Sequence, residues 1–591
     1  MARGCQLTFF GEMRSWNLSM NRTFGSVIPV SGCELAGLVK KAVFTCLLGT
    51  SLSTAISLEV PSFMSDNMVL QRGREITIWG RAAVGSEVSI EIAGKSGSQT
   101  VPQTGDWHVD LEPLPEGGPY ELTIRASGSE ALSFTNVMVG DVWFASGQSN
   151  MEWPVASALD STAEIAAARY PEMRLYQVDK SEQMTPQWEA SGEWLAVTPD
   201  SIPRFSAVAY YFGRRLHQEL DIPIGLIDST FGGTPAELWM PREALAKELG
   251  ETEARVGATL YNGMVHPFIP YPIRGVIWYQ GEANVAQAEL YRRLFPALIQ
   301  SWREAWSRED LPFGFVQIAP FRYAGRGREH EAAELRQAQL MVDETIANTG
   351  MVVTLDIGNP TDIHPRNKQE VGRRLALWAL SEVYDYDVAY SGPVLESEAL
   401  VEGAIQLHFR HAEKGLITSD GAPVSHLEIA GKDRVFRPAT GTIDGSTLVV
   451  KSDAVPEPLA VRYAWRHDAE PNLMNLEGFP CSSFRTMNWR DSDGDGFADR
   501  GEFAAGTDHL DPSSFFIVQQ ARKGRFPGSV ELVVPAVFGS SYDVYVKSDL
   551  SIGPWLFQST LRNTRSGLET LQILVPLSEQ AGSQFFRVSV R

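Results

Sequence analysis

The chain has 591 residues, too many for one ordinary hydrophobic core, so we expect several domains. Hydrophobic residues make up 43% of the sequence and aromatic residues 10%, which is typical of folded protein and excludes a largely disordered chain. The formal net charge of -21 argues against a nucleic acid or an anionic membrane as partner, because both repel an acidic protein.

Residues 1–57 are predicted to be a leader region. Two lysines precede a short apolar run at 42–48, and small residues follow it, which is typical of a secretory signal peptide. The run is too short and too rich in Ser and Thr for a membrane span. Because a signal peptide begins a chain, we hypothesise that translation starts near Val39; a disordered N-terminus with a chance apolar run is the alternative. The signal predicts export to the periplasm, the cell surface or the medium.

The four cysteines do not form a disulfide framework in the main body of the chain. Three of them lie in the first 46 residues, and Cys481 stands alone. We therefore expect Cys481 to be a small buried hydrophobic residue and not a catalytic thiol.

Residues 58–390 divide into two predicted domains. From 58 to 136, short alternating strands separated by Gly, Pro and Ser turns predict a β-sandwich. From 137 to 390, apolar strands alternate with helices, which predicts an α/β domain with a three-layer parallel sheet. The expected strands of this domain are 142–145, 224–227, 276–278, 315–318 and 351–355, and the expected helices are 205–220, 287–306, 332–346 and 368–380.

The rest of the chain is predicted to be mostly β-structure. Alternating strands return at 391–486 and indicate a β-domain flanking the α/β domain. An acidic linker is expected at 487–512. Residues 513–591 are predicted to form a C-terminal β-sandwich module.

Three polar or glycine-rich turns follow strands of the predicted parallel sheet. Ser149, the pair Gly232 and Gly233, and the segment 280–282 each come directly after such a strand. Ligands bind beyond the carboxyl ends of the strands in folds of this type. We therefore expect the three turns to meet in one crevice.

A serine hydrolase site can be built from Ser149 and a downstream loop. A serine hydroxyl is a poor nucleophile until a base removes its proton, and His364 can supply that base. Asp362, two residues earlier, would hold the imidazole in the right tautomer and stabilise its charged form. Pro365 suits the first turn of the helix that follows. The backbone N–H of Ser149 is one donor that an oxyanion would need, and the other candidates are Gly232, Gly233, Gln280 and Asn284.

Each of these residues also has a purely structural interpretation. Ser149 and Asp362 are both suitable helix caps, and Gly232 with Gly233 can simply turn the chain. Their combination at strand ends favours a catalytic site over these separate roles.

Four motif blocks make the chain resemble the sialate O-acetylesterase family of SGNH hydrolases. The resemblance runs from about residue 64 to 485, and the four blocks occur in the family's order. It implies the flavodoxin-like fold of that superfamily, with Ser149 as nucleophile, His364 as base and Asp362 as its partner. The blocks are Gly147-Gln148-Ser149-Asn150-Met151, Gly232-Gly233-Thr234-Pro235, Trp278-Tyr279-Gln280-Gly281-Glu282-Ala283-Asn284 and Asp362-Ile363-His364-Pro365.

Some features depart from related patterns or leave alternatives open. Asp362 and His364 are separated by one residue, whereas the superfamily usually has two residues between its Asp and His. Asp356 therefore remains as a second, weaker candidate for the acid. Met151 stands where an α/β-hydrolase elbow has glycine, which disfavours that fold. Glu282 is either the second acid of a glycosidase or part of a buried structural ion pair. Three aromatic residues, Trp153, Trp239 and Tyr261, either line a sugar pocket or belong to the core.

Residues 491–502 match a calcium-binding loop. Carboxylates recur at alternate positions, Gly496 stands at the sharp turn, and Glu502 is placed for bidentate ligation. We expect one structural Ca²⁺ here, because an acidic linker rarely spaces its carboxylates in this way. The predicted ligands are Asp491, Asp493, Asp495, Phe497 through its carbonyl, Asp499 and Glu502.

The sequence thus predicts an exported serine esterase that removes O-acetyl groups from a carbohydrate without a catalytic cofactor. Acetylated sialic acid and acetylated xylan, pectin or another polysaccharide are the candidate substrates. The competing hypothesis is an inert carbohydrate-binding or surface protein, and a glycosidase using Glu282 is a further alternative.

Overall fold

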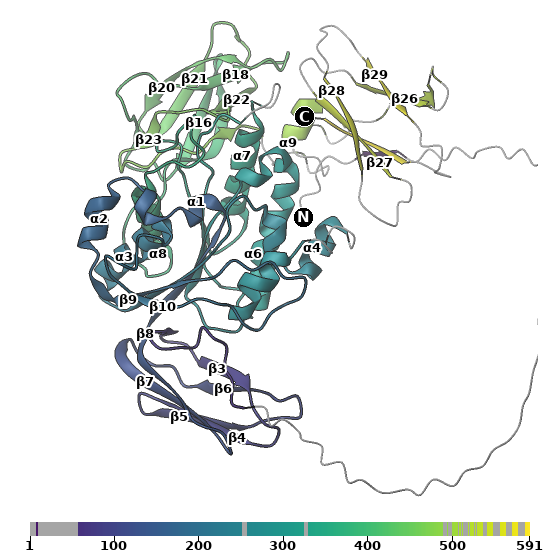
Figure 1. The fold of residues 1–591 in the computed structure, drawn as a ribbon. Coiled ribbons are helices and arrows are strands. Elements are labelled where there is room, and N and C mark those ends of the chain that lie inside the picture. Colours follow the sequence, from purple (N-terminus) through teal and green to yellow (C-terminus); the bar gives the residue numbers. More distant parts are fainter. Residues whose placement is uncertain are drawn as a thin grey trace, which may run out of the picture.

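The computed structural model describes residues 57–250, 257–323 and 329–487 continuously, together with Leu7–Phe9, Ala254 and parts of 493–590 (Figure 1). Of the predicted leader, only β1 (Leu7–Phe9) and residue 57 are described. The signal peptide and most of the predicted calcium loop therefore lie outside the described residues. No helix in the described part of the chain is long and apolar enough to cross a membrane.

Seven strands of an eleven-stranded sheet form the centre of the α/β domain. Their order is β10-β9-β11-β8-β12-β13-β14, and all neighbours from β9 to β14 are parallel. The edge strand β10 runs antiparallel to β9, so the sheet is mixed. The prediction of a purely parallel sheet is wrong for this strand. The chain reaches β10 directly from β9 without a crossover helix, and such a connection places the two strands antiparallel. The strands are β8 (Leu132–Gly147), β9 (Tyr170–Gln177), β10 (Trp194–Val197), β11 (Ile224–Thr230), β12 (Gly275–Tyr279), β13 (Phe313–Val316) and β14 (Thr349–Val352).

Helices cover both faces of this sheet, as predicted (Figure 1). On one face α3 (Ala207–Leu220) packs against α8 (Lys368–Glu382), and on the other α6 (Ala288–Ala305) packs against α7 (Glu331–Thr345). The side chains of β8 alternate between the two resulting cores: Val142 and Phe144 face one, whereas Trp143 and Ala145 face the other. Shorter helices are α1 (Ser149–Glu152), α2 (Ser161–Ala167) and α4 (Arg242–Leu249).

Strand β8 also belongs to the N-terminal β-region, so the predicted boundary at 136/137 falls inside one continuous strand. Its first half pairs with β7, and its second half pairs with β11 and β12. β5 was not expected, because its sequence Lys95–Thr100 has no apolar residue and alternates only between half-buried and exposed positions. The strands are β2 (Val69–Gln71), β3 (Ile76–Arg81), β4 (Glu87–Ile92), β5 (Lys95–Thr100), β6 (Asp106–Leu111) and β7 (Gly117–Ala126).

Two further β-regions follow the α/β domain. The first contains β15 (Val394–Val401), β16 (Ala404–Arg410), β17 (Leu416–Thr418), β18 (Leu427–Ala430), β19 (Arg437–Pro438), β20 (Thr440–Asp444), β21 (Thr447–Lys451), β22 (Ala460–Tyr463), β23 (Leu473–Asn475) and β24 (Phe484–Arg485). In the second, two small sheets share one core. This region contains α9 (Asp499–Ala505), β25 (Gln520–Lys523), β26 (Ser529–Pro535), β27 (Ser541–Lys547), β28 (Leu556–Arg562), β29 (Thr570–Pro576) and β30 (Phe585–Val590).

Candidate active site

Ser149 is the first residue of α1, directly beyond the carboxyl end of the central strand β8. The turn between them depends on Gly147, whose φ is +131°. A Cβ at this position would lie 2.3 Å from the carbonyl oxygen of Tyr279 in β12, so only glycine fits. The neighbouring N–H of Gln148 donates to the same carbonyl at 3.0 Å. The turn is therefore fixed to the sheet and leaves the half-buried Ser149 at its edge.

His364 lies in the loop between β14 and α8, and its ring meets the serine. Its Nε2 is 2.8 Å from Ser149 Oγ, within hydrogen-bonding distance. The Trp153 ring stacks on the imidazole with a centroid separation of 4.8 Å and an interplanar angle of 17°. The structure therefore brings together two side chains that are 215 positions apart in the sequence.

Asp362 is close to the imidazole but its described hydrogen bond goes to the backbone. Its Oδ1 accepts from the N–H of His364 at 2.9 Å. The other candidate acid, Asp356, forms two hydrogen bonds with the guanidinium of Arg374, at 2.6 and 2.8 Å, and is engaged away from His364. Of the two carboxylates, Asp362 is thus the one that influences the ring.

The loop that contains His364 ends before the helix begins. α8 starts at Lys368, because the side chain of Asn367 accepts from the N–H of Glu370 at 3.2 Å and caps the helix. Pro365 therefore precedes the helix, and its expected place in the first turn is wrong.

The charge environment holds the pKa of His364 below its usual value. Partial burial lowers this pKa most, the ammonium of Lys368 lowers it further, and the carboxylate of Asp362 raises it. A lowered pKa keeps the imidazole neutral at pH 7, which is the form that can accept a proton.

Asn150 connects the serine turn to the histidine loop, a role that the sequence did not reveal. It is fully buried, and its Nδ2 donates to Glu282 Oε1 at 2.5 Å and to the carbonyl oxygen of Ile363 at 3.0 Å. Lys368 Nζ donates to Asn150 Oδ1. Burial lowers the pKa of Lys368 to about 7 and raises the pKa of Glu282. Within the described residues Glu282 thus bonds to the amide of Asn150 and forms no direct ion pair, so a bridge through Asn150 to Lys368 stands in place of the expected buried ion pair. The position of Asn150 next to Ser149 was the signal for its role that the sequence offered.

The glycine turn after β11 lies directly over the serine. A Cβ on Gly232 would lie 3.2 Å from Ser149 Cβ and 3.0 Å from Glu152 Oε2. The N–H of Gly232 donates to that same Glu152 oxygen at 2.6 Å, so in this conformation it is not available to an oxyanion. Gly233 has φ +79° and an exposed backbone, and nothing lies within 4 Å of where its Cβ would be. Ser149 N–H at the start of α1 and Gly233 N–H remain as backbone candidates.

Gln280 and Asn284 are both buried and bonded to the glycine turn and its surroundings. Gln280 Nε2 donates to Asn284 Oδ1 at 2.7 Å and to the Thr234 carbonyl oxygen at 3.2 Å. Asn284 Nδ2 donates to Glu237 Oε2 at 2.9 Å. These contacts occupy both N–H groups of Gln280 but only one of Asn284, so Asn284 is the better candidate for the side-chain donor.

The three candidate aromatic residues separate into two groups. Trp239 is fully buried against Trp278, with its indole N–H bonded to Thr234 at 3.0 Å, and Tyr261 is 5% exposed. Both belong to the core. Trp153 is half-buried and stacks on His364, so of the three it is the one that lies at the candidate site.

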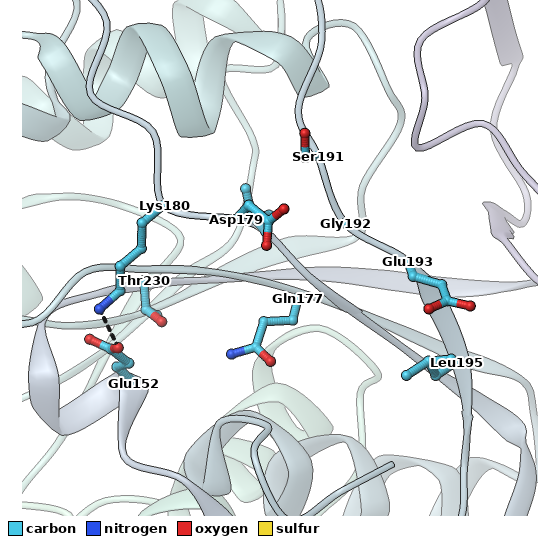
Figure 2. A pocket seen from close by; sticks show the side chains of 10 residues that line it. Glu152, Gln177, Asp179, Lys180, Ser191, Gly192, Glu193, Leu195 and Thr230 are labelled. Carbon is cyan, nitrogen blue, oxygen red and sulfur yellow. Dashed lines mark ion pairs between the residues drawn. The ribbon is translucent and has the colours of Figure 1, made fainter.

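A cleft of about 670 Å³ opens at the carboxyl ends of β9 and β11 (Figure 2). Its wall includes Glu152, which shares α1 with Ser149, and the register of β11 places Thr230 beside Gly147. The cleft therefore lies at the same sheet edge as the serine. It is lined by Glu152, Gln177, Val178, Asp179, Lys180, Ser191, Gly192, Glu193, Leu195 and Thr230.

Comparison with known proteins identifies the family. A family model described as "Carbohydrate esterase, sialic acid-specific acetylesterase" matches residues 139–381, which include Ser149, Asp362 and His364. Human sialate O-acetylesterase is 29% identical over 482 residues, covering 73% of this chain and 91% of the human protein, and the mouse protein is 27% identical over 505 residues, covering 72% and 92%. The crystal structure of a carbohydrate acetylesterase from Xanthomonas citri is 39% identical, with a TM-score of 0.69, and covers 73% of this chain and 99% of that one.

The chain belongs to the sialate O-acetylesterase family. It is accordingly a carboxylic ester hydrolase. The family resemblance predicted from the four motif blocks is confirmed, and the bacterial relative shares the fold.

In this member of the sialate O-acetylesterase family, the predicted calcium loop is only partly described. Asp491, Asp495 and Phe497 lie outside the described residues. Asp499 and Glu502 are buried in the first turn of α9, three positions apart and so on one helix face, an arrangement that fits two ligands of one ion. Asp493, Asp499 and Glu502 do not come together as a group of three metal ligands in the described part of the chain. The Ca²⁺ therefore remains a prediction from the sequence pattern.

Proposed function

We propose that this protein is a serine esterase that removes O-acetyl groups from a carbohydrate through an acyl-serine intermediate. The observation that supports this most is the 2.8 Å contact between Ser149 Oγ and His364 Nε2 at the carboxyl edge of the sheet. A hydroxyl at that distance from a neutral imidazole can lose its proton as it attacks a carbonyl carbon.

In the first half of the reaction, Ser149 Oγ attacks the acetyl carbonyl while His364 Nε2 takes the hydroxyl proton. Negative charge develops on the carbonyl oxygen, and the N–H groups of Ser149 and Gly233, with the free N–H of Asn284, are the proposed donors. If Glu152 releases the N–H of Gly232, that group joins them. The C–O bond to the sugar then breaks, and His364 returns its proton to the departing sugar oxygen.

In the second half, water hydrolyses the acetyl-serine. His364 removes a proton from the water as its oxygen attacks the acetyl carbon, and then protonates Ser149 Oγ as the ester bond breaks. Acetate leaves and the free serine is restored. Asp362 stabilises the imidazolium that forms in both halves, because its negative charge raises the pKa of His364. No catalytic cofactor takes part in this scheme.

The proposed substrate is an O-acetylated carbohydrate, which agrees with the names of the human and bacterial relatives. Acetylated sialic acid and acetylated plant or algal polysaccharides such as xylan or pectin are the two classes to compare. Export, and one structural Ca²⁺ in the segment 491–502, are parts of the same proposal and depend on the sequence patterns alone.

The test is acetate release from an aryl acetate and from acetylated glycans. Ser149→Ala should lower both rates by several orders of magnitude. Ser146→Ala is the matched control: this serine lies in β8 just before the turn to Ser149, and its buried hydroxyl has no hydrogen-bond partner in the described residues. Equal rates for Ser149→Ala and the wild type would refute the esterase proposal and favour the inert carbohydrate-binding protein.

A further inference from the structure

The cleft beside Ser149 has an excess of negative charge. Its lining includes three carboxylates, from Glu152, Asp179 and Glu193, and one cation, from Lys180. Lys180 Nζ lies 2.5 Å from Glu152 Oε1, and it also lies 4.6 Å from the centroid of the Phe231 ring. The single cation is therefore already engaged by an anion and an aromatic face.

The other two carboxylates have no such partner. Asp179 and Glu193 are exposed, and neither forms an ion pair within the described part of the chain. Figure 2 shows Glu193 well apart from the Lys180–Glu152 pair. The cleft therefore presents two uncompensated negative charges to anything that enters it.

The cleft is close enough to the serine to receive part of its substrate. Glu152 and Ser149 are three positions apart on α1. The N–H of Gly232 donates to Glu152, and a Cβ on Gly232 would lie 3.2 Å from Ser149 Cβ. The cleft begins at the end of β9, which is separated from β8 by β11 alone. Adjacent strands are about 4.8 Å apart, so the two ends are roughly 10 Å from each other.

We infer that this cleft is the subsite for the sugar that bears the acetyl group, and that its charge selects uncharged sugars over anionic ones. This inference rests on the proposed esterase function and narrows its substrate class. A neutral sugar can donate its hydroxyls to the exposed carboxylates of Asp179 and Glu193. A sugar carboxylate placed in the same cleft is repelled by them and finds Lys180 already paired. The natural substrate is accordingly a neutral acetylated glycan and not an acetylated sialic acid.

The experiment compares an O-acetylated sialic acid with its carboxamide, which differs mainly in charge. We expect the wild type to have the higher kcat/KM on the carboxamide. Glu193→Gln should reduce this preference about three-fold, and Asp179→Asn should act in the same direction, since each removes one repelling charge. High salt should reduce the wild-type preference as well, because the interaction passes through solvent.

Two controls separate charge from other effects. Glu172→Gln removes an exposed carboxylate from β9 that does not line the cleft, so it should leave the preference unchanged. Glu172→Gln should also hydrolyse an aryl acetate at the wild-type rate. For Glu193→Gln and Asp179→Asn the readout is the ratio of kcat/KM on the carboxamide to kcat/KM on the acid within each variant, so a general change in activity cancels.

The results that would overturn the charge selection differ from the result that would overturn the esterase proposal. The inference is overturned if the wild type hydrolyses the acid and the carboxamide at equal rates or prefers the acid. It is also overturned if Glu193→Gln leaves the preference intact, or if the enzyme hydrolyses the aryl acetate but neither sugar. If Ser149→Ala retains the wild-type rate on the aryl acetate, the esterase proposal itself fails.

Discussion

The side-chain amide of Asn150 is hydrogen-bonded to the carbonyl oxygen of Ile363 at 3.0 Å. Asn150 is the chain neighbour of Ser149, and Ile363 is the chain neighbour of His364. One buried amide therefore joins the turn that holds the proposed nucleophile to the loop that holds the proposed base. The same amide group accepts from Lys368 and donates to Glu282, so its orientation is fixed on both sides.

Asn150→Ala should lower kcat about 100-fold, because a displacement of about 1 Å between reacting groups has an effect of this size. The variant should also be less stable, since Lys368 and Glu282 lose their shared partner in the interior. The measurement is kcat on an aryl acetate together with the melting temperature.

Asn472→Ala provides the matched control for this variant. Asn472 is likewise buried and makes several hydrogen bonds, to Asp420, Pro423 and Ser425, in the β-region 391–486. It should lower stability and leave kcat unchanged. If Asn150→Ala loses stability but keeps the wild-type kcat, Asn150 has only a structural role.

The pH dependence should report the pKa of His364. Burial and Lys368 lower this pKa, so the acidic limb of kcat/KM should have its midpoint below the ordinary value of 6.5. Asp362→Asn removes the one charge that raises it, so the midpoint should move to still lower pH. The plateau should fall at least about 10-fold, because the imidazolium loses its stabilising charge. A midpoint that stays in place would show that Asp362 does not act on the ring.

Asp228 in β11 should make stability depend on pH. It is buried, with hydrogen bonds from Thr230 Oγ1 at 2.7 Å and from the N–H of Ser206 at 3.3 Å, and burial raises its pKa from 3.8 to about 7. A raised pKa means that the folded state holds the proton longer than the unfolded state. Its contribution to stability is complete below pH 3.8 and is lost as the pH rises through about 7.

The free energy of unfolding should therefore decline by about 1 kcal/mol per pH unit over this range because of Asp228 alone. Asp228→Asn should flatten the decline, and the exposed Asp453→Asn should not. Denaturant unfolding between pH 4.5 and 7.5 measures both. An unchanged slope in Asp228→Asn would contradict the raised pKa.

Calcium should stabilise the full-length protein through residues 491–502. Ligand at 100 times its Kd adds about 2.7 kcal/mol to the free energy of unfolding, so Ca²⁺ should raise the melting temperature and a chelator should lower it again. Asp495→Ala should abolish this response, whereas Asp453→Ala should retain it. A melting temperature that is independent of Ca²⁺ would contradict the prediction that residues 491–502 bind a structural Ca²⁺.

The sequence was sufficient for features that depend on periodicity or on turn chemistry. The apolar run 142–145 predicted the centre of the sheet, and Gly147 with Ser149 predicted a turn at its end. The contact between Ser149 and His364 was predicted from the need of a serine nucleophile for a base and from the family resemblance. In contrast, β5, β9 and β10 were missed. β5 has no apolar side chain, charged residues interrupt the apolar ones in β9, and the apolar run of β10 has only four residues.

The hydrogen-bond partners of the buried polar side chains could not be predicted from the sequence. Gln280 and Asn284 are both amides at the end of β12, and only the coordinates show that the two N–H groups of Gln280 are occupied. The same holds for Lys368, whose spacing within α8 gives no indication that its ammonium is buried against Asn150. These contacts depend on how distant loops pack, which a local pattern does not encode.

The most direct test of the central claim is to trap the enzyme during turnover of an aryl acetate and map the covalent acetyl group by mass spectrometry. We predict an acetyl group on Ser149 in the wild type and none in Ser149→Ala. Acetyl on a different residue, or turnover by Ser149→Ala at the wild-type rate, would contradict the account.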